Sequence, residues 1–479
     1  MPLPTIPSGN VASALPTGYD VANSCMFDKG DAPELSRSTG DGNERIGNFS
    51  FWWKTAMPHD GFVFYNVYID SSNFFAIGMD GGGNIEVVNK SGGSYNMQLE
   101  TTAAYRDHTA WYHVCALIDT TQATDTNRMK LYINGTQVTS FQTSTYPAQD
   151  TDLKMNSNSQ TARISPSQNR GHGYLAEFVA IDGTVKAVTD FGEFDEDSPT
   201  IWKPKDVAGL SGDKGVNGFY LDFEDSSALG NCAFGGTDFT VSNLAAIDQM
   251  IDSPTNNFCT LNPLNNMASA HMVITDGNLH KHNQPTNNYW RSIYATMGAS
   301  SGKWYYEMLV TNDEGSDVGN MFIGIVDADQ MDNHLTASAH YKFVTRSRGY
   351  GYFGQNGNKD NNASSSSFGN TWGNGDRLGC AFDLDNNKIY FSKNGTWENS
   401  GDPTSGATGT GSAFDLASGY TYLPVIGVHY GNSQMDLNFG SPMAAISSGN
   451  ADGDGYGNFE YAVPSGYYAL CTKNLAEYG

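Results

Sequence analysis

The closest approach to a catalytic pattern in this sequence is a short acidic run, Glu193-Phe-Asp-Glu-Asp-Ser198. Enzymes that hydrolyse glycosidic bonds use two carboxylates that must face one cleft, and in a strand the side chains two residues apart share a face. Here Glu196 and Asp197 break the alternation, and Ser-Pro follows directly, so the run is interpreted as a loop. We therefore expect no catalytic residue in this chain, and polysaccharide hydrolysis is the least favoured function.

A few histidines and aspartates have the spacing of metal ligands. His280 and His282 lie on one side of an extended segment, and His271 is the nearest further imidazole. Asp383-Leu-Asp-Asn-Asn387 and Asp452-Gly-Asp-Gly455 are rich in oxygen ligands but lack the final bidentate glutamate of an EF-hand, and both suit tight turns. The sequence predicts an exposed histidine pair and two turns, and it identifies no metal ligand.

These patterns favour a protein that binds a ligand without catalysing a reaction. The sequence contains neither a Walker-type phosphate loop nor a Cys-x-x-Cys pair. Sugar recognition combines aromatic faces with amide and carboxylate side chains. Residues of these types gather in segments interpreted as loops of the C-terminal half: Tyr289, Trp290, Arg291, Tyr350, Tyr352, Trp372 and Asn374. Each of them could instead pack at the edge of a fold.

Short strands are the elements that must position these residues. Glycine (54 residues) and aromatic residues (12%) are abundant, while charged residues reach only 16%, a composition typical of strands joined by tight turns. A chain of 479 residues also exceeds the roughly 250–300 over which a single core grows. Strand-length apolar runs lie at residues 49–54, 61–69, 74–79, 111–118, 130–133, 174–181, 218–223, 303–310, 321–326, 349–353, 377–383, 388–391 and 422–428. The sequence predicts an all-β protein with two tandem antiparallel β-sandwich (jelly-roll) domains.

The spacing of the runs gives the expected domain boundaries. We predict an N-terminal attachment arm at residues 1–20, a sandwich at 21–225, a connector at 226–266, a second sandwich at 267–440, and a C-terminal tail at 441–479 that packs on a sandwich. Each half also runs a Lys-apolar-Tyr-apolar strand into an Asn-Gly pair, at 134–135 and 394–395. Asn-Gly tolerates positive φ, so both pairs predict tight hairpins.

Motifs in the first half resemble the concanavalin-like (laminin-G-like) jelly-roll lectin fold. They are Asn48-Phe-Ser-Phe-Trp-Trp-Lys54, Trp111-Tyr-His-Val114, Lys130-Leu-Tyr-Ile-Asn-Gly135 and Gly173-Tyr-Leu-Ala-Glu-Phe178, in that order over about 200 residues, a normal domain size. The resemblance implies a single large sandwich. It also implies calcium as a candidate ion in oxygen-rich loops, with no other cofactor.

Motifs in the second half are similar to those of SPRY domains. They are Gly302-Lys-Trp-Tyr-Tyr-Glu307, Phe322-Ile-Gly-Ile-Val326, Gly375-Asp-Arg-Leu-Gly-Cys380, Lys388-Ile-Tyr-Phe-Ser-Lys-Asn-Gly395 and Tyr422-Leu-Pro-Val-Ile-Gly427. In that family partner recognition lies in the loops, which favours the aromatic loop residues named above as a binding site.

Four further segments, beside the motifs given above, resemble sequence motifs in virion proteins of tailed bacteriophages. They are residues 191–205, 217–223, 252–264 and 469–475. The resemblance implies a structural protein of the virion surface, made in the host cytoplasm. We expect a tail fibre or other host-facing appendage that binds a cell-surface glycan, lipopolysaccharide or receptor, with capsid decoration or a head fibre as the alternative. Its partners would be other virion proteins and further copies of the chain, with a trimer favoured.

Charge, apolar stretches and cysteine positions argue against nucleic-acid binding, membrane insertion and disulfide bonds. The net charge of −25 argues against nucleic-acid binding, which needs clustered Lys and Arg. No apolar stretch approaches the roughly 18 residues of a membrane span, and the N-terminus has no signal-peptide pattern, so we expect neither membrane insertion nor export. The six cysteines are far apart and several lie in apolar runs, which predicts buried free thiols.

Overall fold

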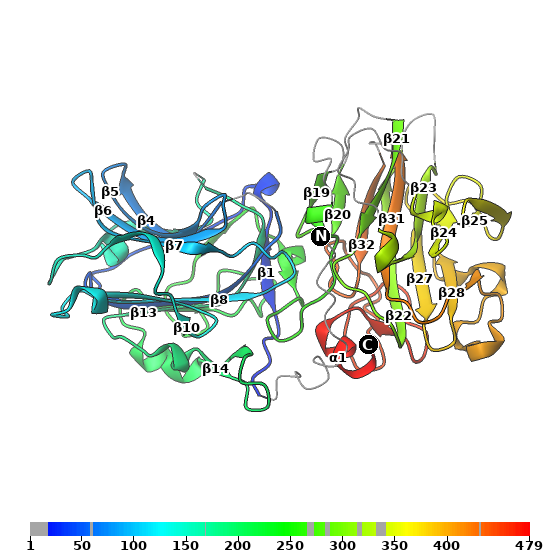
Figure 1. The fold of residues 1–479 in the computed structure, drawn as a ribbon. Helices are drawn as coiled ribbons and strands as arrows, with labels where there is room; N and C mark the ends of the chain where they lie inside the picture. Colours follow the sequence, from blue (N-terminus) through cyan, green and yellow to red (C-terminus); the bar gives the residue numbers. More distant parts are fainter. Residues whose placement is uncertain are drawn as a thin grey trace. The chain divides into compact units, whose positions relative to one another are not determined.

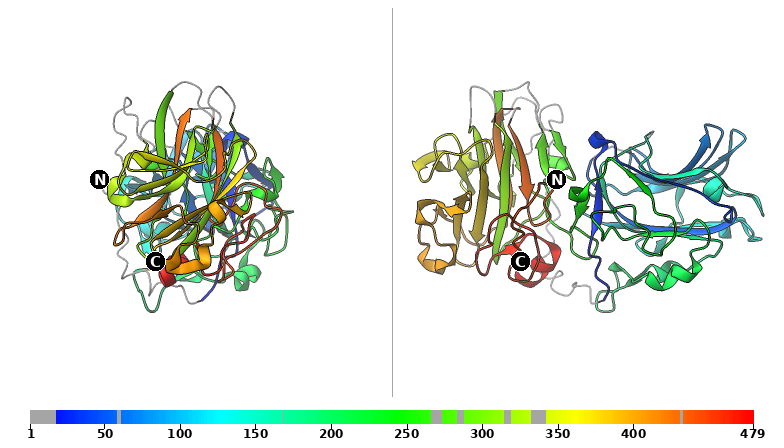
Figure 2. Two further views of the ribbon diagram at one scale, coloured as in Figure 1. Left: turned by 90° about the vertical axis from the view of Figure 1, so that its right-hand side faces the viewer. Right: turned by 180° about the vertical axis from the view of Figure 1, so that it is seen from behind.

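The computed structural model describes residues 18–57, 61–167, 169–265, 273–282, 288–313, 319–331, 342–430 and 433–479. The chain forms two units, Pro16–Asn256 and Asn257–Gly479, which we call the first and second unit. Figures 1 and 2 show both, and each is described by itself. Antiparallel sheets dominate each unit, so the predicted all-β fold with two sandwiches is confirmed. Within the described residues no helix combines the length and apolar character needed to cross a bilayer.

The first unit is a sandwich of two eight-stranded sheets, seen as two facing layers in Figure 1. Sheet A has the order β10 (Thr136–Gln137), β9 (Met129–Ile133), β8 (Tyr112–Asp119), β3 (Ile46–Thr55), β13 (Gly173–Asp182), β1 (Ser24–Phe27) and β18 (Gln249–Met250), with β16 (Phe219–Leu221) also on β13. Sheet B has the order β11 (Phe141–Thr145), β7 (Ser94–Ala104), β6 (Asn84–Ser91), β5 (Asn73–Met79), β4 (Phe62–Asp70), β12 (Thr161–Ile164), β2 (Glu34–Ser38) and β17 (Thr240–Ser242).

Aromatic side chains fill the space between these sheets. On β3, Phe51 and Trp53 alternate with residues of the outer face, as the strand period of two requires. The ring of Phe51 lies 4.6 Å from that of Phe64 on β4, and the ring of Trp53 lies 4.3 Å from that of Phe62. All four side chains are at most 1% exposed. Such pairs add about 0.5–1.5 kcal/mol each beyond simple burial, so they hold the two sheets together.

The chain that follows β13 in this unit, residues 183–256, is called the covering segment, because parts of it pack on the outer face of sheet A. It holds the hairpin of β14 (Gly192–Phe194) and β15 (Trp202–Pro204) and the 3-10 turns η4 (Val188–Asp190), η5 (Ala208–Asp213) and η6 (Ala246–Asp248). Residues 226–256, interpreted from sequence as part of a connector, pack within the first unit: β17 pairs with β2, β18 pairs with β1, and Phe234 and Phe239 are buried. Single buried apolar residues attach this stretch to the first unit, so its sequence shows no alternation of apolar and polar residues. The remaining 3-10 turns of this unit are η1 (Lys29–Asp31), η2 (Asp125–Asn127) and η3 (Lys154–Asn156).

The second unit is a sandwich of a nine-stranded and a six-stranded sheet. The larger has the order β19 (Val273–Thr275), β20 (His280–His282), β32 (Gln434–Asn438), β22 (Lys303–Asn312), β27 (Arg377–Asp383), β28 (Lys388–Lys393) and β29 (Thr396–Trp397), with β30 (Phe414–Asp415) on β28 and β33 (Tyr468–Ala469) on β22. The smaller has the order β21 (Asn288–Tyr294), β31 (Tyr422–Tyr430), β23 (Met321–Asp327), β24 (Gly349–Phe353), β25 (Asn358–Asn361) and β26 (Ser364–Ser367). The 3-10 turns η7 (Pro263–Asn265), η8 (Ala328–Gln330), η9 (Phe343–Thr345), η10 (Glu398–Ser400) and η11 (Pro403–Thr408) connect strands.

The C-terminal residues of this unit are ordered and buried against its larger sheet. Strand β33 pairs in parallel with β22, and α1 (Thr472–Tyr478) follows it. Phe459, Tyr467 and Leu470 have no exposed surface, because they pack on the side of the sheet that faces away from the six-stranded layer. Between the two layers the Tyr306 hydroxyl donates to the carbonyl of Gly324 at 2.7 Å.

Two local expectations are confirmed. Asn134 and Gly135 have φ of 48° and 73°, and Asn394 and Gly395 have φ of 49° and 78°, as the two central residues of a type I′ hairpin require. The first pair joins β9 to β10 and the second joins β28 to β29. All six cysteines are free and buried.

Candidate ligand-binding sites

The aromatic residues predicted to form a binding site lie in the interior of the second unit. Trp290, Tyr350, Tyr352 and Trp372 are between 0% and 9% exposed, Arg291 is 5% exposed, and Asn374 alone of the described side chains is exposed. The side chain of Tyr289 lies outside the described residues. The structure therefore does not bring the seven residues together as one exposed surface.

Each of the buried rings has a packing partner. Trp290 lies 5.2 Å from Phe322, and the Lys342 ammonium lies 4.1 Å from its ring centroid. Tyr352 stacks at 5.5 Å on Phe391 of the facing sheet. Its hydroxyl donates to a backbone carbonyl, and the Tyr350 hydroxyl accepts a backbone N–H at 3.1 Å. These side chains have packing roles, and their binding of a ligand stays a prediction.

The acidic run that came closest to a catalytic pair begins in strand β14 and continues into the turn of the β14–β15 hairpin, so its interpretation as a loop holds only for residues 195–198. Glu193 pairs across the hairpin with Lys203, with 3.7 Å between carboxylate and ammonium. Asp195 accepts the backbone N–H groups of Asp197 and Ser198 at 3.0 and 2.9 Å, and its second oxygen lies 3.2 Å from the Lys203 ammonium. Because Asp195 caps a turn and is 3% exposed, its carboxylate has a structural task.

The aspartates of the two calcium-like segments also cap turns. Asp383 accepts the backbone N–H and the side-chain amide of Asn386, both at 2.8 Å, and Asp452 accepts the backbone N–H groups of Asp454 and Tyr456. His280 is not in an exposed loop as predicted: it lies in strand β20 with 12% of its side chain exposed, and its Nδ1 lies 2.5 Å from a carboxylate oxygen of Asp436. The ring of His282 and all of His271 lie outside the described residues.

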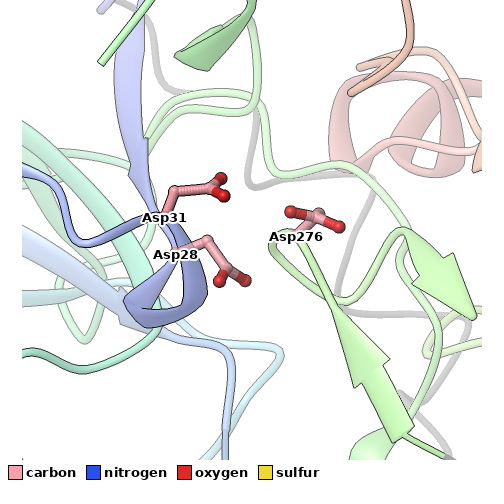
Figure 3. A group of neighbouring side chains, drawn as sticks. All are labelled: Asp28, Asp31 and Asp276. Atoms are coloured by element: carbon pink, nitrogen blue, oxygen red, sulfur yellow. The ribbon is translucent and has the colours of Figure 1, made fainter. Parts of the chain in front are cut away.

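Two further patterns in the chain carry no site. Residues 298–302 read Gly-Ala-Ser-Ser-Gly, the string of a serine-hydrolase elbow, but they precede strand β22 instead of joining a strand to a helix. Figure 3 labels three aspartates, Asp28, Asp31 and Asp276. The first two belong to the first unit, where Asp28 caps η1 by accepting the N–H of Gly30 at 2.7 Å, and Asp276 belongs to the second unit, so we assign no joint site to them.

The outer face of sheet A holds a buried ion pair. Lys54 points away from the core, and its ammonium contacts the carboxylate of Asp252 in the covering segment. Trp111 Nε1 donates to the other oxygen of Asp252 at 3.0 Å, and the Lys54 ammonium lies 4.6 Å from the ring centroid of Tyr174. Each charged residue is 1% exposed. The additional donor and the ring are needed because two charges removed from water lose their hydration.

A neutral histidine lies on the same face. Trp202 Nε1 on β15 donates to His113 Nδ1 at 3.0 Å, and since an indole nitrogen only donates, Nδ1 carries the lone pair. The imidazole proton is therefore on Nε2, which donates to the Ser50 hydroxyl at 2.8 Å. Burial lowers the pKa of His113 to about 3. In a Ser-His nucleophile the histidine accepts from the hydroxyl, so this pair instead attaches β15 to sheet A.

A buried carboxyl interrupts strand β13. Glu177 sits at a β-bulge with a φ of 50°, which is uncommon for a residue other than glycine. Tyr220 on β16 donates to Glu177 Oε2 at 2.8 Å, and the Tyr19 hydroxyl lies 3.1 Å from the Tyr220 hydroxyl. Burial raises the pKa of Glu177 to about 8, and the negative charges of Asp222 and Glu224 act in the same direction. This carboxyl is therefore protonated in the folded protein at neutral pH.

One cleft on the outer face of sheet A has the size and chemistry of a ligand site. Its volume is about 310 Å³, at the lower end of the range for small-ligand pockets. It lies between strands β8 and β9, the turn that joins them, and the loop after β13. Its lining residues are Leu117, Ile118, Asp119, Gln122, Asn127, Lys130, Tyr132 and Val185.

Strand geometry and turn hydrogen bonds fix the groups in this cleft. On β9, Lys130 and Tyr132 alternate with buried residues and therefore point outward. Asp119 accepts from the backbone N–H and hydroxyl of Thr121 at 3.0 and 2.6 Å, and from Gln122 Nε2 at 2.6 Å. Although burial opposes it, these hydrogen bonds hold the pKa of Asp119 below its ordinary value. The cleft combines one aromatic ring with fixed charged and amide groups, which suits a hydroxyl-rich ligand.

Sequence reasoning identified the strands of this cleft but not the site. The alternation in Lys130-Leu-Tyr-Ile133 could have placed Tyr132 on the outer face, since Leu131 and Ile133 face the core. No sequence signal connects Val185 with this strand, because the loop after β13 reaches the cleft only through the fold.

Family comparisons agree with the two sandwiches. Residues 45–184 match the model of the concanavalin A-like lectin/glucanases superfamily, and residues 303–442 match that of the SPRY domain. The chain is 27% identical over 186 residues to the ATP-dependent RNA helicase Ddx1 of Drosophila melanogaster, covering 38% of this chain and 20% of that protein. It is 29% identical over 163 residues to the probable ATP-dependent RNA helicase ddx1 of Dictyostelium discoideum, covering 33% and 17%. The chain thus spans a fifth or less of the length of these relatives.

Solved structures similar to part of the chain include the SPRY domain of human HERC1. It has 16% identity and a TM-score of 0.26, and the match covers 36% of this chain and 94% of that one. The heptameric SAP-like pentraxin of Limulus polyphemus has 14% identity and a TM-score of 0.26, covering 34% and 77%. On the family models, this chain carries a concanavalin A-like lectin domain followed by a SPRY domain, a pair of folds that suggests a binding or protein-interaction role.

Proposed function

We propose that this protein binds a cell-surface glycan through the cleft on sheet A and performs no catalysis. The observation that carries the proposal is the cleft itself, where the Tyr132 ring lies beside Asp119, Gln122 and Lys130. A sugar presents an apolar C–H face and a rim of hydroxyls, so one ring and several fixed polar groups match its chemistry. Asp195 caps a turn and His113 accepts a hydrogen bond from Trp202, and these structural roles support a function without catalysis.

The biological setting that we propose is the surface of a phage particle. The resemblance of residues 191–205, 217–223, 252–264 and 469–475 to virion proteins supports this setting. In a tail fibre or host-facing appendage the cleft would contact the host cell, and a trimer would present three copies of it. Capsid decoration is the alternative, and a reconstruction of the intact particle distinguishes the two by the position of the protein.

Glycan arrays with the purified full chain test the binding proposal. We expect the chain to bind bacterial lipopolysaccharide or capsular glycans, and Tyr132→Ala to weaken the Kd roughly tenfold, the effect of losing about 1.4 kcal/mol of stacking. Tyr132→Phe keeps the ring and should retain most of the affinity. Tyr420→Ala removes an exposed tyrosine ring (37%) from the second unit, away from the cleft, and is the control. Absence of any glycan ligand and of adsorption to cells, or equal binding by Tyr132→Ala, would refute the proposal.

A further inference from the structure

A row of aromatic side chains crosses the outer face of sheet B. Tyr68 on β4 pairs with Phe74 on β5, Phe74 pairs with Lys90 on β6, and Lys90 pairs with Tyr95 on β7. Residues paired directly across antiparallel strands point to the same face. Phe75, the neighbour of Phe74, is fully buried in the core, so the row of four points away from it.

The row is open to solvent and its rings are close together. Tyr68 is 38% and Tyr95 46% exposed, while Phe74 and Lys90 are half-buried between them. The ring centroids of Tyr68 and Phe74 are 6.0 Å apart, and those of Phe74 and Tyr95 are 6.2 Å apart. The Lys90 ammonium lies 5.1 Å from the Tyr95 ring centroid. From β4 to β7 the row spans three strand spacings, about 14 Å.

Two hairpins joined to each other hold the row in place. The turn between β4 and β5 is closed by Asp70, which accepts the N–H of Ser72 at 2.7 Å. The turn between β6 and β7 uses Gly92 and Gly93 with φ of 57° and 87°, the positive values of a type I′ turn. Gly92 N donates to the side chain of Asn73 at 3.0 Å and links the two turns. A ligand that stacks on the rings would therefore meet a surface that is already ordered.

Charges on this face indicate which ligand fits. Glu86 and Glu100 pair with each other two rows further along the same face, where Gln98 donates to Glu86 at 2.9 Å and Gln142 donates to Glu100 at 2.6 Å. Asp70 lies at the other end, and the chain carries a net charge of −25. A polyanion would be repelled by these carboxylates, whereas a neutral polymer of hydroxyl groups can hydrogen-bond to the amides and carboxylates.

We propose that this aromatic row binds a neutral polysaccharide, with sugar rings stacked on the exposed rings of Tyr68 and Tyr95, with Phe74 supporting these two rings from between them, and with Lys90 donating hydrogen bonds to sugar hydroxyls. The length of the row fits several linked sugars instead of one terminal residue. The inference rests on the proposed glycan-binding function in its ligand class, but it concerns a surface on the opposite sheet from the cleft. A chain with both sites would hold a long glycan at two points and gain avidity.

Affinity electrophoresis in native gels tests the row. The full chain would be run through gels containing hydroxyethyl cellulose, laminarin, mannan or dextran, with alginate as the acidic polymer. We expect at least one neutral polymer to retard the wild type and alginate to have no effect. Tyr68→Ala with Tyr95→Ala should weaken this retardation on the order of tenfold or more, because two stacking contacts are lost. Tyr68→Phe with Tyr95→Phe keeps both rings and should behave as the wild type.

Variants of the two sites separate this inference from the proposed function. If Tyr132→Ala abolishes binding to neutral polymers and the double alanine variant does not, the row is not a binding site and the cleft proposal stands. If the double variant alone loses binding to the neutral polymers, the row is supported, and the cleft proposal is decided separately by the glycan arrays with Tyr132→Ala. If alginate retards the wild type and Lys90→Gln removes this retardation, the ligand is not a neutral polymer. If none of the polymers retards the wild type, the inference is wrong.

Discussion

The two outer faces of the first sandwich carry the same pair of side-chain types in opposite surroundings. On sheet A the Lys54 ammonium lies 4.6 Å from the ring of Tyr174, and on sheet B the Lys90 ammonium lies 5.1 Å from the ring of Tyr95. Lys54 is buried together with the carboxylate of Asp252, while Lys90 is half-buried and Tyr95 is exposed. The covering segment decides whether a Lys-aromatic pair stabilises the fold or remains available to a ligand.

The energetic consequences of this difference are large. A cation near a ring contributes about 0.5–1 kcal/mol where water surrounds it, and removing both from a surface costs little. Under the covering segment the ammonium has lost its hydration, and Asp252 supplies the opposite charge and accepts from Trp111. Removal of one partner there leaves the other charge buried without compensation.

The largest predicted effect is therefore at Lys54 and Asp252. We expect Lys54→Met to lower the free energy of unfolding by about 3–5 kcal/mol, because the Asp252 carboxylate stays buried without its cation. Denaturant unfolding of the full chain, followed by tryptophan fluorescence, measures this loss in the transition of the first unit. The double variant Lys54→Met with Asp252→Asn is the control and should recover part of the loss. A single variant as stable as the wild type would contradict the role assigned to the ion pair.

A pH-dependent effect is expected at Glu177, the buried carboxyl on β13 of sheet A. Its folded pKa of about 8 lies above that of an unfolded glutamate, near 4.3. Between these values the folded chain holds a proton that the unfolded chain releases, so this group lowers the free energy of unfolding as pH rises. Its slope reaches at most about 1.4 kcal/mol per pH unit.

The variant Glu177→Gln removes that titration while an amide oxygen can still accept from Tyr220. We expect its stability relative to the wild type to increase from pH 5 to pH 8, measured by urea denaturation at several pH values. Asp222→Asn removes a neighbouring negative charge and should change the profile less. Parallel stability profiles of Glu177→Gln and the wild type would contradict the raised pKa.

The sequence predicted most long strands of both units because each must bury an apolar face. It did not predict which aromatic residues of β4 face outward. The residues of this strand are apolar on both sides, and a β-bulge at Val63 and Tyr65 shifts the register, so that Phe64 and Tyr65 both face the core and Tyr68 faces solvent. Strict alternation from Phe64 would have placed Tyr68 inside.

For a related reason, the sequence did not show that most residues of the site predicted in the second unit are buried. Tyr350 and Tyr352 lie in β24, a strand of the six-stranded sheet, and Tyr352 stacks on the facing layer. Aromatic residues separated by glycine resemble a binding loop in sequence, and only the pairing of the strands shows that they are covered. Contacts between distant segments, such as Asp252 with Lys54, have no local signal at all.

The most direct test of the comparison is one substitution made on both faces, where the smaller of the two expected effects lies on the open face. Tyr174→Ala on the covered face removes a ring that is 1% exposed and should cost about 3 kcal/mol of unfolding free energy, because it leaves a cavity over Lys54. Tyr95→Ala on the open face removes a ring that is 46% exposed and should change stability by less than about 0.5 kcal/mol. Both are measured by urea denaturation of the full chain. Equal losses would mean that the open face is as important for folding as the covered one, and the surface row would then have to be explained by packing instead of by a ligand.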